Sequence, residues 1–363
     1  MSNRQRQTTL IFLTVVFVAA LIQGCLGDGS LWDVAEVPVP PAIQQDIAAS
    51  SEWYELYLTE PSADRNRGGP DAALAAAMDR ARVSIDIAAY DLNLWSLRNA
   101  LIDAHRRGVQ VRMVTETNNL DRREIGELQD AGIPILDDNR EGLMHNKFVI
   151  IDREQVWTGS MNFTLNGAYR NDNNLIQIRS AELAQDYLVE FEEMFVDDQF
   201  GFVSPANTPN PRIVVDGTTI DVFFSPDDGV QNDLVELIYS AEESVHFLAF
   251  SFTADPLTDA LLDIAEGGVV VRGIFDDGQV ESNTGGDFAT MRDAGLDVRR
   301  DGNEFKMHHK VIIIDGKIVA FGSYNFSRSA EVRNDENLLI IYNETLAQEF
   351  LDEFTRIYEQ AGR

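Results

Sequence analysis

Short apolar runs alternate along the chain with longer segments in which apolar residues recur at helical spacing. This spacing predicts helices over residues 71–81 and 94–107, and β-rich runs predict strands over 83–89 and 109–115. Alternating helices and strands of this kind predict a mainly parallel or mixed sheet covered by helices.

The second half of the chain has the same order of predicted elements. Helices are expected over 232–241 and 256–266, and strands over 245–252 and 269–275. Further strands and a closing helix are expected at 148–151, 156–158 and 181–195 in the first half and at 311–314, 318–321 and 344–360 in the second. The runs 148–151 and 311–314 are apolar at every position, which is typical of central strands buried on both faces.

Two proline-rich segments interrupt the periodic pattern. Residues 26–50 have neither helical nor strand period and contain Pro38, Pro40 and Pro41, which predicts a spacer. A second break near residues 204–212 contains Pro205, Pro209 and Pro211. We therefore expect two domains, 51–203 and 218–363, joined by a linker at 204–217. A long loop inside one large domain is the alternative, favoured only if the flanking segments are unrelated.

The flanking segments are related. Many polar positions of the first half recur in the second at a constant offset of 163 residues. The repeated residues are Met144, His145, Lys147, Asp152, Gly159, Ser160, Asn162, Phe163, Arg170, Asn171, Asp172 and Asn174, matched by Met307, His308, Lys310, Asp315, Gly322, Ser323, Asn325, Phe326, Arg333, Asn334, Asp335 and Asn337. Weaker similarity links 97–112 to 257–272 at an offset of 160. The chain is therefore a tandem duplication.

The first residues have the features of an export signal. Arg4 and Arg6 precede an uncharged apolar run at 10–22, which is shorter than the roughly 20 residues that a membrane-spanning helix needs. Cys25 follows directly and is the single cysteine of the chain, so it cannot form an internal disulfide. Residues 22–25 resemble a bacterial lipobox. We expect residues 1–24 to be a lipoprotein signal peptide and 25–50 to be a lipid anchor and spacer.

This segment also predicts a location. Lipid attached to Cys25 would hold an exported protein at a membrane of the bacterial cell envelope. Leu26, rather than Asp, follows the cysteine and favours the outer membrane or the periplasmic face.

Charge narrows the range of partners. The 363 residues carry 60 acidic and 29 basic side chains, a formal net charge of −31. Nucleic acids and anionic membranes would be repelled at long range, so no broad surface is expected to bind them by charge alone. Any phosphate site must be a local exception.

The repeated polar residues form a motif suited to phosphate chemistry. Residues two apart on a strand point to one face, so His145 lies beside Lys147, and His308 beside Lys310. The ammonium group supplies charge to a phosphate oxygen and helps to keep the neighbouring imidazole neutral and nucleophilic.

The Gly-Ser-x-Asn segments add uncharged donors to this motif. Glycine permits close approach of the backbone, while Ser160, Asn162, Ser323 and Asn325 can donate hydrogen bonds to phosphate oxygens. One such motif would carry little weight. The motif occurs twice at a constant offset, and the two halves share its polar residues although many of their apolar residues differ. This pattern predicts a shared functional site.

The paired motif resembles that of the phospholipase D superfamily, over residue 51 to the C-terminus. The resemblance implies two tandem α/β/α sandwich lobes related by a pseudo-twofold axis, with both motifs in one cleft. It also implies cleavage of a phosphodiester without metal or cofactor, through a phosphohistidine. By the usual order of the family, His145 is the nucleophile and His308 the general acid and base. Lys147 and Lys310, with the motif asparagines, would stabilise charge on the phosphoryl oxygens.

The resemblance extends to acidic residues near the motif. The family has an orienting acidic residue eleven positions after the motif asparagine; Glu336 occupies that position in the second half, whereas the first half has Asn173. Asp152 and Asp315 are included among the catalytic candidates of the motif. For these two, contacts that hold the cleft together are favoured over direct contact with substrate.

Other candidate residues have simpler interpretations. His105 fits a solvated helix end, and His246 fits a structural position in a strand. Metal binding by His308 and His309 is disfavoured because their side chains diverge on a strand. Aromatic residues that could line a substrate channel, with core packing as the default, are Trp95, Trp157 and Tyr324.

The substrate is the most open point. Phospholipids and nucleic acids contain the same phosphodiester, but the predicted anchor and the acidic composition favour a phospholipase D acting on a zwitterionic headgroup. The alternatives are an endonuclease of the same superfamily, a phosphatidyl-transferring enzyme similar to cardiolipin synthase, and a non-catalytic binding protein of the envelope. We expect a monomer.

Overall fold

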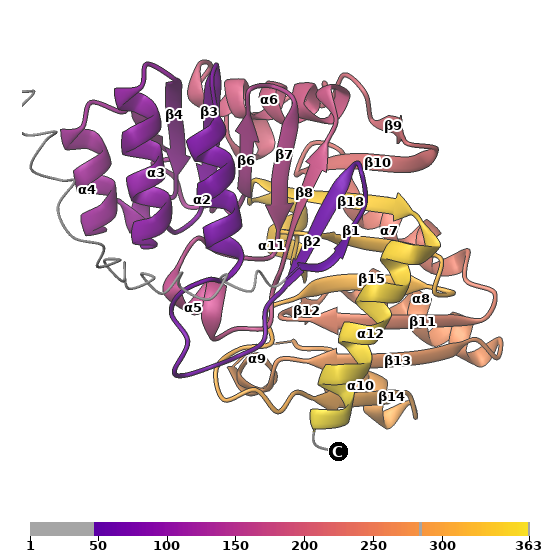
Figure 1. The fold of residues 1–363 in the computed structure, drawn as a ribbon. Helices are drawn as coiled ribbons and strands as arrows, with labels where there is room; N and C mark the ends of the chain where they lie inside the picture. The colour runs from indigo at the N-terminus through magenta and orange to yellow at the C-terminus, as the bar shows by residue number, and fades with distance from the viewer. Residues whose placement is uncertain (1–46, 283–284, 362–363) are drawn as a thin grey trace, which may run out of the picture. The chain divides into compact units, whose positions relative to one another are not determined.

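Two eight-stranded mixed sheets, one from each half of the chain, form the framework of the fold (Figure 1). The computed structural model describes residues 47–282 and 285–361. The first sheet has the order β1 (Ile47–Ser50), β2 (Tyr54–Leu58), β8 (Asn174–Arg179), β7 (Gln155–Gly159), β6 (Lys147–Ile151), β3 (Ser84–Ala89), β4 (Gln110–Thr115) and β5 (Ile135–Asp137).

The second sheet repeats this order with equivalent strands. They are β9 (Arg212–Val215), β10 (Thr218–Ser225), β18 (Glu336–Tyr342), β16 (Ile318–Gly322), β15 (Lys310–Ile314), β11 (Ser244–Ala249), β13 (Val270–Phe275) and β14 (Asp297–Arg300). In each sheet the last three strands are parallel and the other neighbours are antiparallel. A small parallel pair, β12 (Phe252–Thr253) and β17 (Phe326–Ser327), lies outside both sheets.

Helices cover both faces of each sheet. Those of the first half are α2 (Pro70–Arg80), α3 (Trp95–Arg106), α4 (Arg123–Asp130), α5 (Leu165–Tyr169) and α6 (Ala181–Phe195), with short 3-10 turns η1 (Thr117–Asn119) and η2 (Gly201–Val203). Those of the second half are α7 (Val230–Tyr239), α8 (Asp255–Glu266), α9 (Asp277–Ser282), α10 (Phe288–Asp293), α11 (Arg328–Val332) and α12 (Glu344–Gln360).

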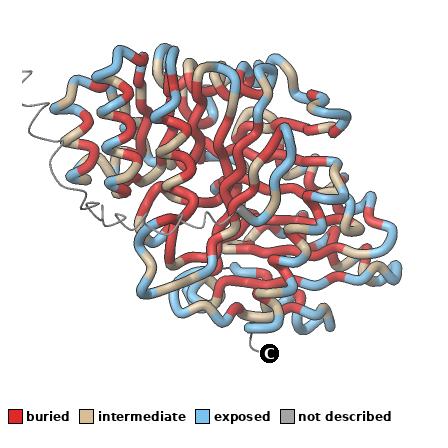
Figure 2. Tube along the Cα trace, in the orientation of Figure 1, coloured by how far each residue is buried: buried red, intermediate tan, exposed pale blue. Residues whose placement is uncertain are grey.

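The apolar residues form three cores. In one, α2, α3 and α4 pack on the first sheet, and in a second, α7, α8 and α10 pack on the second sheet. The third joins α6, α12 and the remaining faces of both sheets, with Phe191 and Phe350 fully buried in it. Burial of each such side chain contributes roughly 1.5–3 kcal/mol relative to exposure. Figure 2 shows the buried positions concentrated along the central strands.

The two long closing helices begin where their sequence predicts. Ser180 Oγ accepts a hydrogen bond from Leu183 N (3.2 Å), and Asn343 Oδ1 accepts one from Leu346 N (2.9 Å). Such N-terminal caps contribute about 0.5–2 kcal/mol each. Helices α6 and α12 therefore have the predicted bounds, 181–195 and 344–360.

The fold confirms the prediction of two tandem α/β lobes and corrects two segments at their edges. Residues 47–50 of the expected spacer form β1, and residues 212–215 of the expected linker form β9. Both are four-residue edge strands paired on one side only, so their sequences need not show the alternation of a buried strand. The proline-rich part of the linker ends at Pro211, directly before β9.

The expected signal peptide and Cys25 lie outside the described residues. Within the described part of the chain, no helix combines the length and apolar character needed to cross a membrane.

Candidate active site

The two His-Lys motifs meet where the halves of the chain exchange backbone hydrogen bonds. His145 N donates to the carbonyl of Asp335 (3.0 Å), and His308 N donates to the carbonyl of Asp172 (2.9 Å). Each motif therefore enters its strand, β6 or β15, beside a segment of the opposite half. This reciprocal pairing places both histidines at one site.

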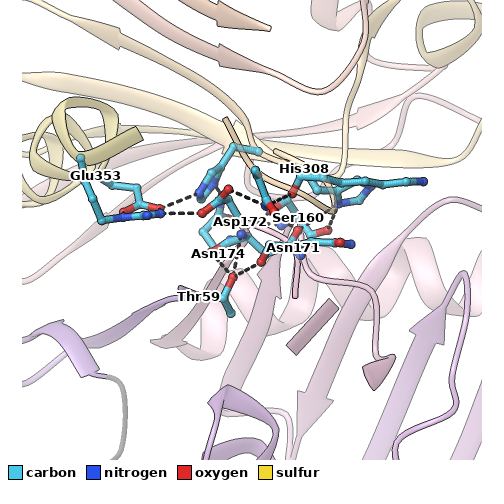
Figure 3. Close-up of polar contacts among 12 residues, drawn as sticks. Thr59, Ser160, Asn171, Asp172, Asn174, His308 and Glu353 are labelled. Atoms are coloured by element: carbon cyan, nitrogen blue, oxygen red, sulfur yellow. Dashed lines mark hydrogen bonds and ion pairs between the residues drawn. The ribbon is translucent and has the colours of Figure 1, made fainter. Parts of the chain in front are cut away.

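Each imidazole is also held by the opposite half. His145 Nδ1 lies 2.7 Å from Glu336 Oε2, and His308 Nδ1 lies 2.9 Å from Asn173 Oδ1 and 3.1 Å from the Ser160 carbonyl. Figure 3 shows His308 beside Ser160. Asn173 Nδ2 donates to the Gly167 carbonyl, which fixes its amide orientation. These partners are acceptors, so Nδ1 donates in both rings and the lone pair of a neutral ring lies on Nε2.

Neither Nε2 atom has a hydrogen-bond partner among the described residues. Burial, with help from Lys147, lowers the pKa of His145 to about 4, although Glu336 opposes this shift. Burial and the nearby charges of Lys310 and Lys147 hold the pKa of His308 well below its usual range. Both rings are therefore neutral at pH 7 when no anion is bound, as a nucleophile requires.

The two lysines are buried cations without a carboxylate partner in the described part of the chain. Lys147 lies 5.0 Å from the Tyr90 ring centroid and donates to the His145 carbonyl. Lys310 lies 4.7 Å from the Phe250 ring and donates to the His308 carbonyl at 2.8 Å. Burial lowers the pKa of Lys147 to about 7 and lowers that of Lys310 strongly. A bound anion would favour the charged form of both groups.

Close backbone approach explains the motif glycines. A Cβ atom on Gly159 would lie 2.4 Å from the Asn174 carbonyl oxygen, and one on Gly322 would lie 2.2 Å from that of Asn337. Gly159 also has φ +147°, which other residues rarely adopt. Glycine therefore lets β7 and β16 come close to the strands that follow the motif.

The motif serines and asparagines differ in whether their side-chain oxygens already have hydrogen-bond partners. Ser160 Oγ donates to Asn173 Oδ1 (2.9 Å), and Ser323 Oγ accepts from Asn337 N (3.0 Å); both side chains are fully buried. The structure thus gives Ser160 an orienting contact instead of the predicted phosphate contact. The side-chain carbonyl oxygens of Asn162 and Asn325 have no hydrogen-bond partner in the described residues. Phosphate would have to be bound by their Nδ2 groups, which are donors, so phosphate binding by these asparagines stays a prediction.

Asp152 and Asp315 lie at the other end of β6 and β15 from the lysines. Asp152 accepts backbone hydrogen bonds from residues 82, 83 and 84, and Asp315 accepts them from residues 242, 243 and 244. Both have left-handed backbone, with φ values of 55° and 53°. They fix the turn after the motif strand to the start of β3 or β11, and a direct catalytic role for either residue stays a prediction.

The remaining candidates are structural, with one exception. His246 packs against Phe354 at a ring distance of 4.9 Å, and His105 lies in the last turn of α3. Trp157 and Tyr324 belong to the core, whereas the Trp95 side chain is 61% exposed. Within the described residues, no group of three or more His, Cys, Asp or Glu side chains is placed to hold a metal ion.

His309 belongs to a second contact network between the halves. Asn174 Nδ2 donates to its Nδ1 (2.9 Å), and its Nε2 donates to Glu353 Oε1 (3.2 Å). The equivalent contact on the other side joins Asn337 Nδ2 to Asn146 Oδ1 (2.7 Å). These side chains point away from the reaction centre and bind the two lobes together.

Two pairs of residues at the site were not singled out from the sequence. Tyr90 and Phe250 pack on His145 and His308 at ring distances of 4.8 and 4.5 Å. Glu116 and Asp276 accept hydrogen bonds, each at 3.0 Å, from the backbone N–H preceding the motif histidines. Both pairs have the offset of 160 seen upstream of the motif, and that shared offset could have revealed them.

Comparison with known proteins places this geometry in context. The family described as "Cardiolipin synthase, PLD-like domain" matches residues 74–195 and 234–358, more than half of the chain.

A phospholipase D of Rickettsia bellii is 34% identical over 198 residues, covering 52% of this chain and 94% of the relative. The human mitochondrial cardiolipin hydrolase is 34% identical over 137 residues, covering 36% of this chain and 54% of the relative. The solved phosphatidylserine synthase of Haemophilus influenzae has a similar fold, with a TM-score of 0.64, 14% identity and coverage of 80% and 84% of the two chains.

Proposed function

The chain belongs to the phospholipase D superfamily and is a phospholipase D-like phosphodiesterase; from this premise we propose that it hydrolyses phospholipid headgroups through a phosphohistidine on His145. The observation that carries the proposal is the contact between His145 Nδ1 and Glu336 (2.7 Å). A ring phosphorylated at Nε2 that keeps its Nδ1 proton is cationic, and a carboxylate stabilises that charge better than the amide of Asn173.

In the first step, His145 Nε2 attacks phosphorus and the bond from phosphorus to the headgroup oxygen breaks. The leaving alkoxide takes a proton from His308 Nε2. His308 is neutral in the free protein because burial and the lysines lower its pKa. An anionic diester beside Lys147 and Lys310 offsets their repulsion and raises the pKa of His308, so that the substrate itself promotes protonation of the acid.

In the second step, His308 is neutral and accepts a proton from water as that water attacks phosphorus. The bond from phosphorus to His145 Nε2 breaks, and phosphatidic acid leaves with a restored active site. The positive charges of Lys147 and Lys310 and the amides of Asn162 and Asn325 stabilise negative charge on the phosphoryl oxygens in both steps. An alcohol in place of water would give phosphatidyl transfer.

Phospholipid is the proposed substrate because phospholipase D and cardiolipin hydrolase occur among the relatives, and because the net charge of −31 opposes nucleic acid. The mechanism uses no metal and no cofactor. A lipid on Cys25 would hold the enzyme at the bacterial envelope, close to its substrate.

The test measures headgroup release from phosphatidylcholine and phosphatidylethanolamine liposomes, with chelator present, beside plasmid and single-stranded DNA. We expect turnover of liposomes only, and none with His145→Ala. A phosphoenzyme trapped with labelled substrate should map to His145; a label on His308 would reverse the assignment. Loss of all activity in chelator would contradict the metal-free reaction, and cleavage of DNA alone would establish the nuclease alternative.

A further inference from the structure

A large cavity opens in the first lobe beside the reaction centre, and none of the roles described above uses it. Its volume is about 880 Å³, within the range of about 300–1,000 Å³ typical of small-molecule sites. The beginnings of α2, α3 and α4, together with α5, surround it. Figure 1 shows α5 at the lower end of α2. Gly69 permits this approach, because a Cβ atom there would lie 2.8 Å from the Tyr169 ring.

One loop joins the cavity to the catalytic histidine. Tyr90 packs on His145, and Asp91 is close enough to Lys147 to raise its pKa. Asp91 also forms a two-contact ion pair with Arg122, which lines the cavity (2.7 and 2.9 Å). The same loop continues into three lining residues, 93–95. Residues 90–95 therefore connect the surroundings of His145 to the cavity wall.

Several polar groups in the cavity wall have partners within the protein. Asp71 accepts hydrogen bonds from Tyr169 and Ser96, and Trp95 Nε1 donates to Glu124 (2.8 Å). Most of the exposed wall is apolar, with contributions from Ala72, Leu94, Trp95 and Leu165, while the polar residues Asn66, Arg67, Asp121 and Arg123 also line the cavity. Trp95 is 61% exposed, an unusual state for the largest apolar side chain. Open apolar surface of this extent suits a hydrocarbon ligand better than a charged one.

The duplication provides an internal comparison. At the corresponding offsets, the second lobe has Asp255 in place of Trp95, Arg328 in place of Leu165 and Val332 in place of Tyr169. The cavity beside His308 is about 200 Å³ and is lined by Phe250 and its neighbours. The two sides of the phosphate site therefore differ in size, with the larger space on the side of the proposed nucleophile.

We propose that the cavity of the first lobe binds an acyl chain of the phospholipid substrate. This inference rests on the proposed function, because it assigns the substrate a lipid tail. The diacylglycerol part stays on phosphorus when His145 attacks, whereas the headgroup departs with a proton from His308. The larger apolar space thus serves the part that is retained, and Trp95 forms its rim.

Chain-length dependence of the reaction tests this assignment. The substrates are phosphatidylcholines from dibutyryl to dioctanoyl, kept as monomers, with bis(p-nitrophenyl) phosphate as a diester that has no acyl chain. In the parent enzyme kcat/KM should rise with chain length. Trp95→Ala should lower it for the longest chain by about tenfold, the effect of losing one or two methylene contacts, and leave the nitrophenyl diester unchanged. Ala72→Phe, which adds a phenyl ring to the cavity wall, should weaken the dependence on chain length.

The matched control is Phe202→Ala, which removes an 85% exposed aromatic residue that does not line the cavity. It should keep the parent's dependence on chain length. Equal losses for all substrates in Trp95→Ala and Ala72→Phe, or unchanged chain-length dependence in both, would overturn the inference.

A binding measurement separates this inference from the proposed reaction. His145→Ala protein should show quenching of tryptophan fluorescence by lysophosphatidylcholine with a brominated chain, and Trp95→Phe in the same background should remove most of it. Quenching without headgroup release by the parent would refute the proposed function and leave the acyl site standing. Headgroup release without quenching would refute the acyl site alone. Quenching by an oligonucleotide instead of the lipid would identify a base-binding cavity.

Discussion

Replacing Glu336 with glutamine tests which histidine carries the phosphoryl group. Glu336 is fully buried and lies 2.7 Å from His145 Nδ1. Glutamine can present an oxygen to the same Nδ1–H, so the tautomer of the ring is kept and only the charge is lost. Hydrogen bonds to charged groups contribute roughly 1.5–3 kcal/mol. At about 1.4 kcal/mol per factor of ten, kcat should fall by roughly 10- to 150-fold.

The assay is single-turnover headgroup release followed over pH. His145 must be neutral to attack, so activity is lost as pH falls through its pKa of about 4. Glu336 raises that pKa; without its charge the pKa falls further, and the acid limb of the profile should move to lower pH. Circular dichroism and thermal unfolding confirm that the variant is folded.

The matched variant is Asn173→Asp, which adds a carboxylate beside His308. It should cost much less activity than Glu336→Gln and should raise the pKa of His308, moving the basic limb of the profile to higher pH. Comparable losses in the two variants, or an acid limb that does not move in Glu336→Gln, would refute the assignment of His145 as the nucleophile that depends on Glu336.

Three further predictions concern residues around the site. Asp315→Ala removes the acceptor of three backbone N–H groups. It should lower the free energy of unfolding, measured in urea, by about 1–3 kcal/mol and leave kcat of the folded enzyme unchanged. A drop in kcat at unchanged stability would instead indicate a catalytic role. Gly322→Ala places a Cβ atom 2.2 Å from the Asn337 carbonyl oxygen. This should lower the free energy of unfolding by about 1–3 kcal/mol or more. An unchanged midpoint of urea unfolding would count against this close approach. Burial raises the pKa of Glu193 and of Asp227 to about 7, so that each carboxyl must ionise in a buried position as pH rises. The double variant Glu193→Gln/Asp227→Asn should therefore gain stability over the parent as pH rises from about 4 to about 7, measured by urea unfolding, with a constant gain above that. A gain that does not change between about pH 4 and 7 would refute this explanation.

Repetition and periodicity in the sequence predicted the framework of the fold. The fully apolar run 148–151 is part of the central strand β6, and the helices at 181–195 and 344–360 have their predicted bounds. Hydrophobic pattern identifies elements that are buried on a face, and it fails for β1 and β9, whose four residues lie at sheet edges.

The sequence indicated which residues belong to the candidate site but not which of them contact one another. The resemblance to the family identified Glu336, yet 191 residues separate it from the histidine that it contacts, and no local pattern predicts such a pairing. The particular contacts of Asp152 were not predicted for a related reason. Its position in the motif suggested chemistry, whereas its left-handed backbone and its bonds to the start of β3 depend on a turn that the sequence does not reveal.

The exchange of supporting residues between the halves has an evolutionary consequence. An ancestral half that functioned alone would have had to pair with an identical copy, and both of its rings would then have met the same supporting side chain. Joining the copies in one polypeptide removed that constraint, so that Glu336 and Asn173 could diverge. Under the proposed mechanism, gene fusion would have allowed one imidazole to specialise in bond formation and the other in proton transfer.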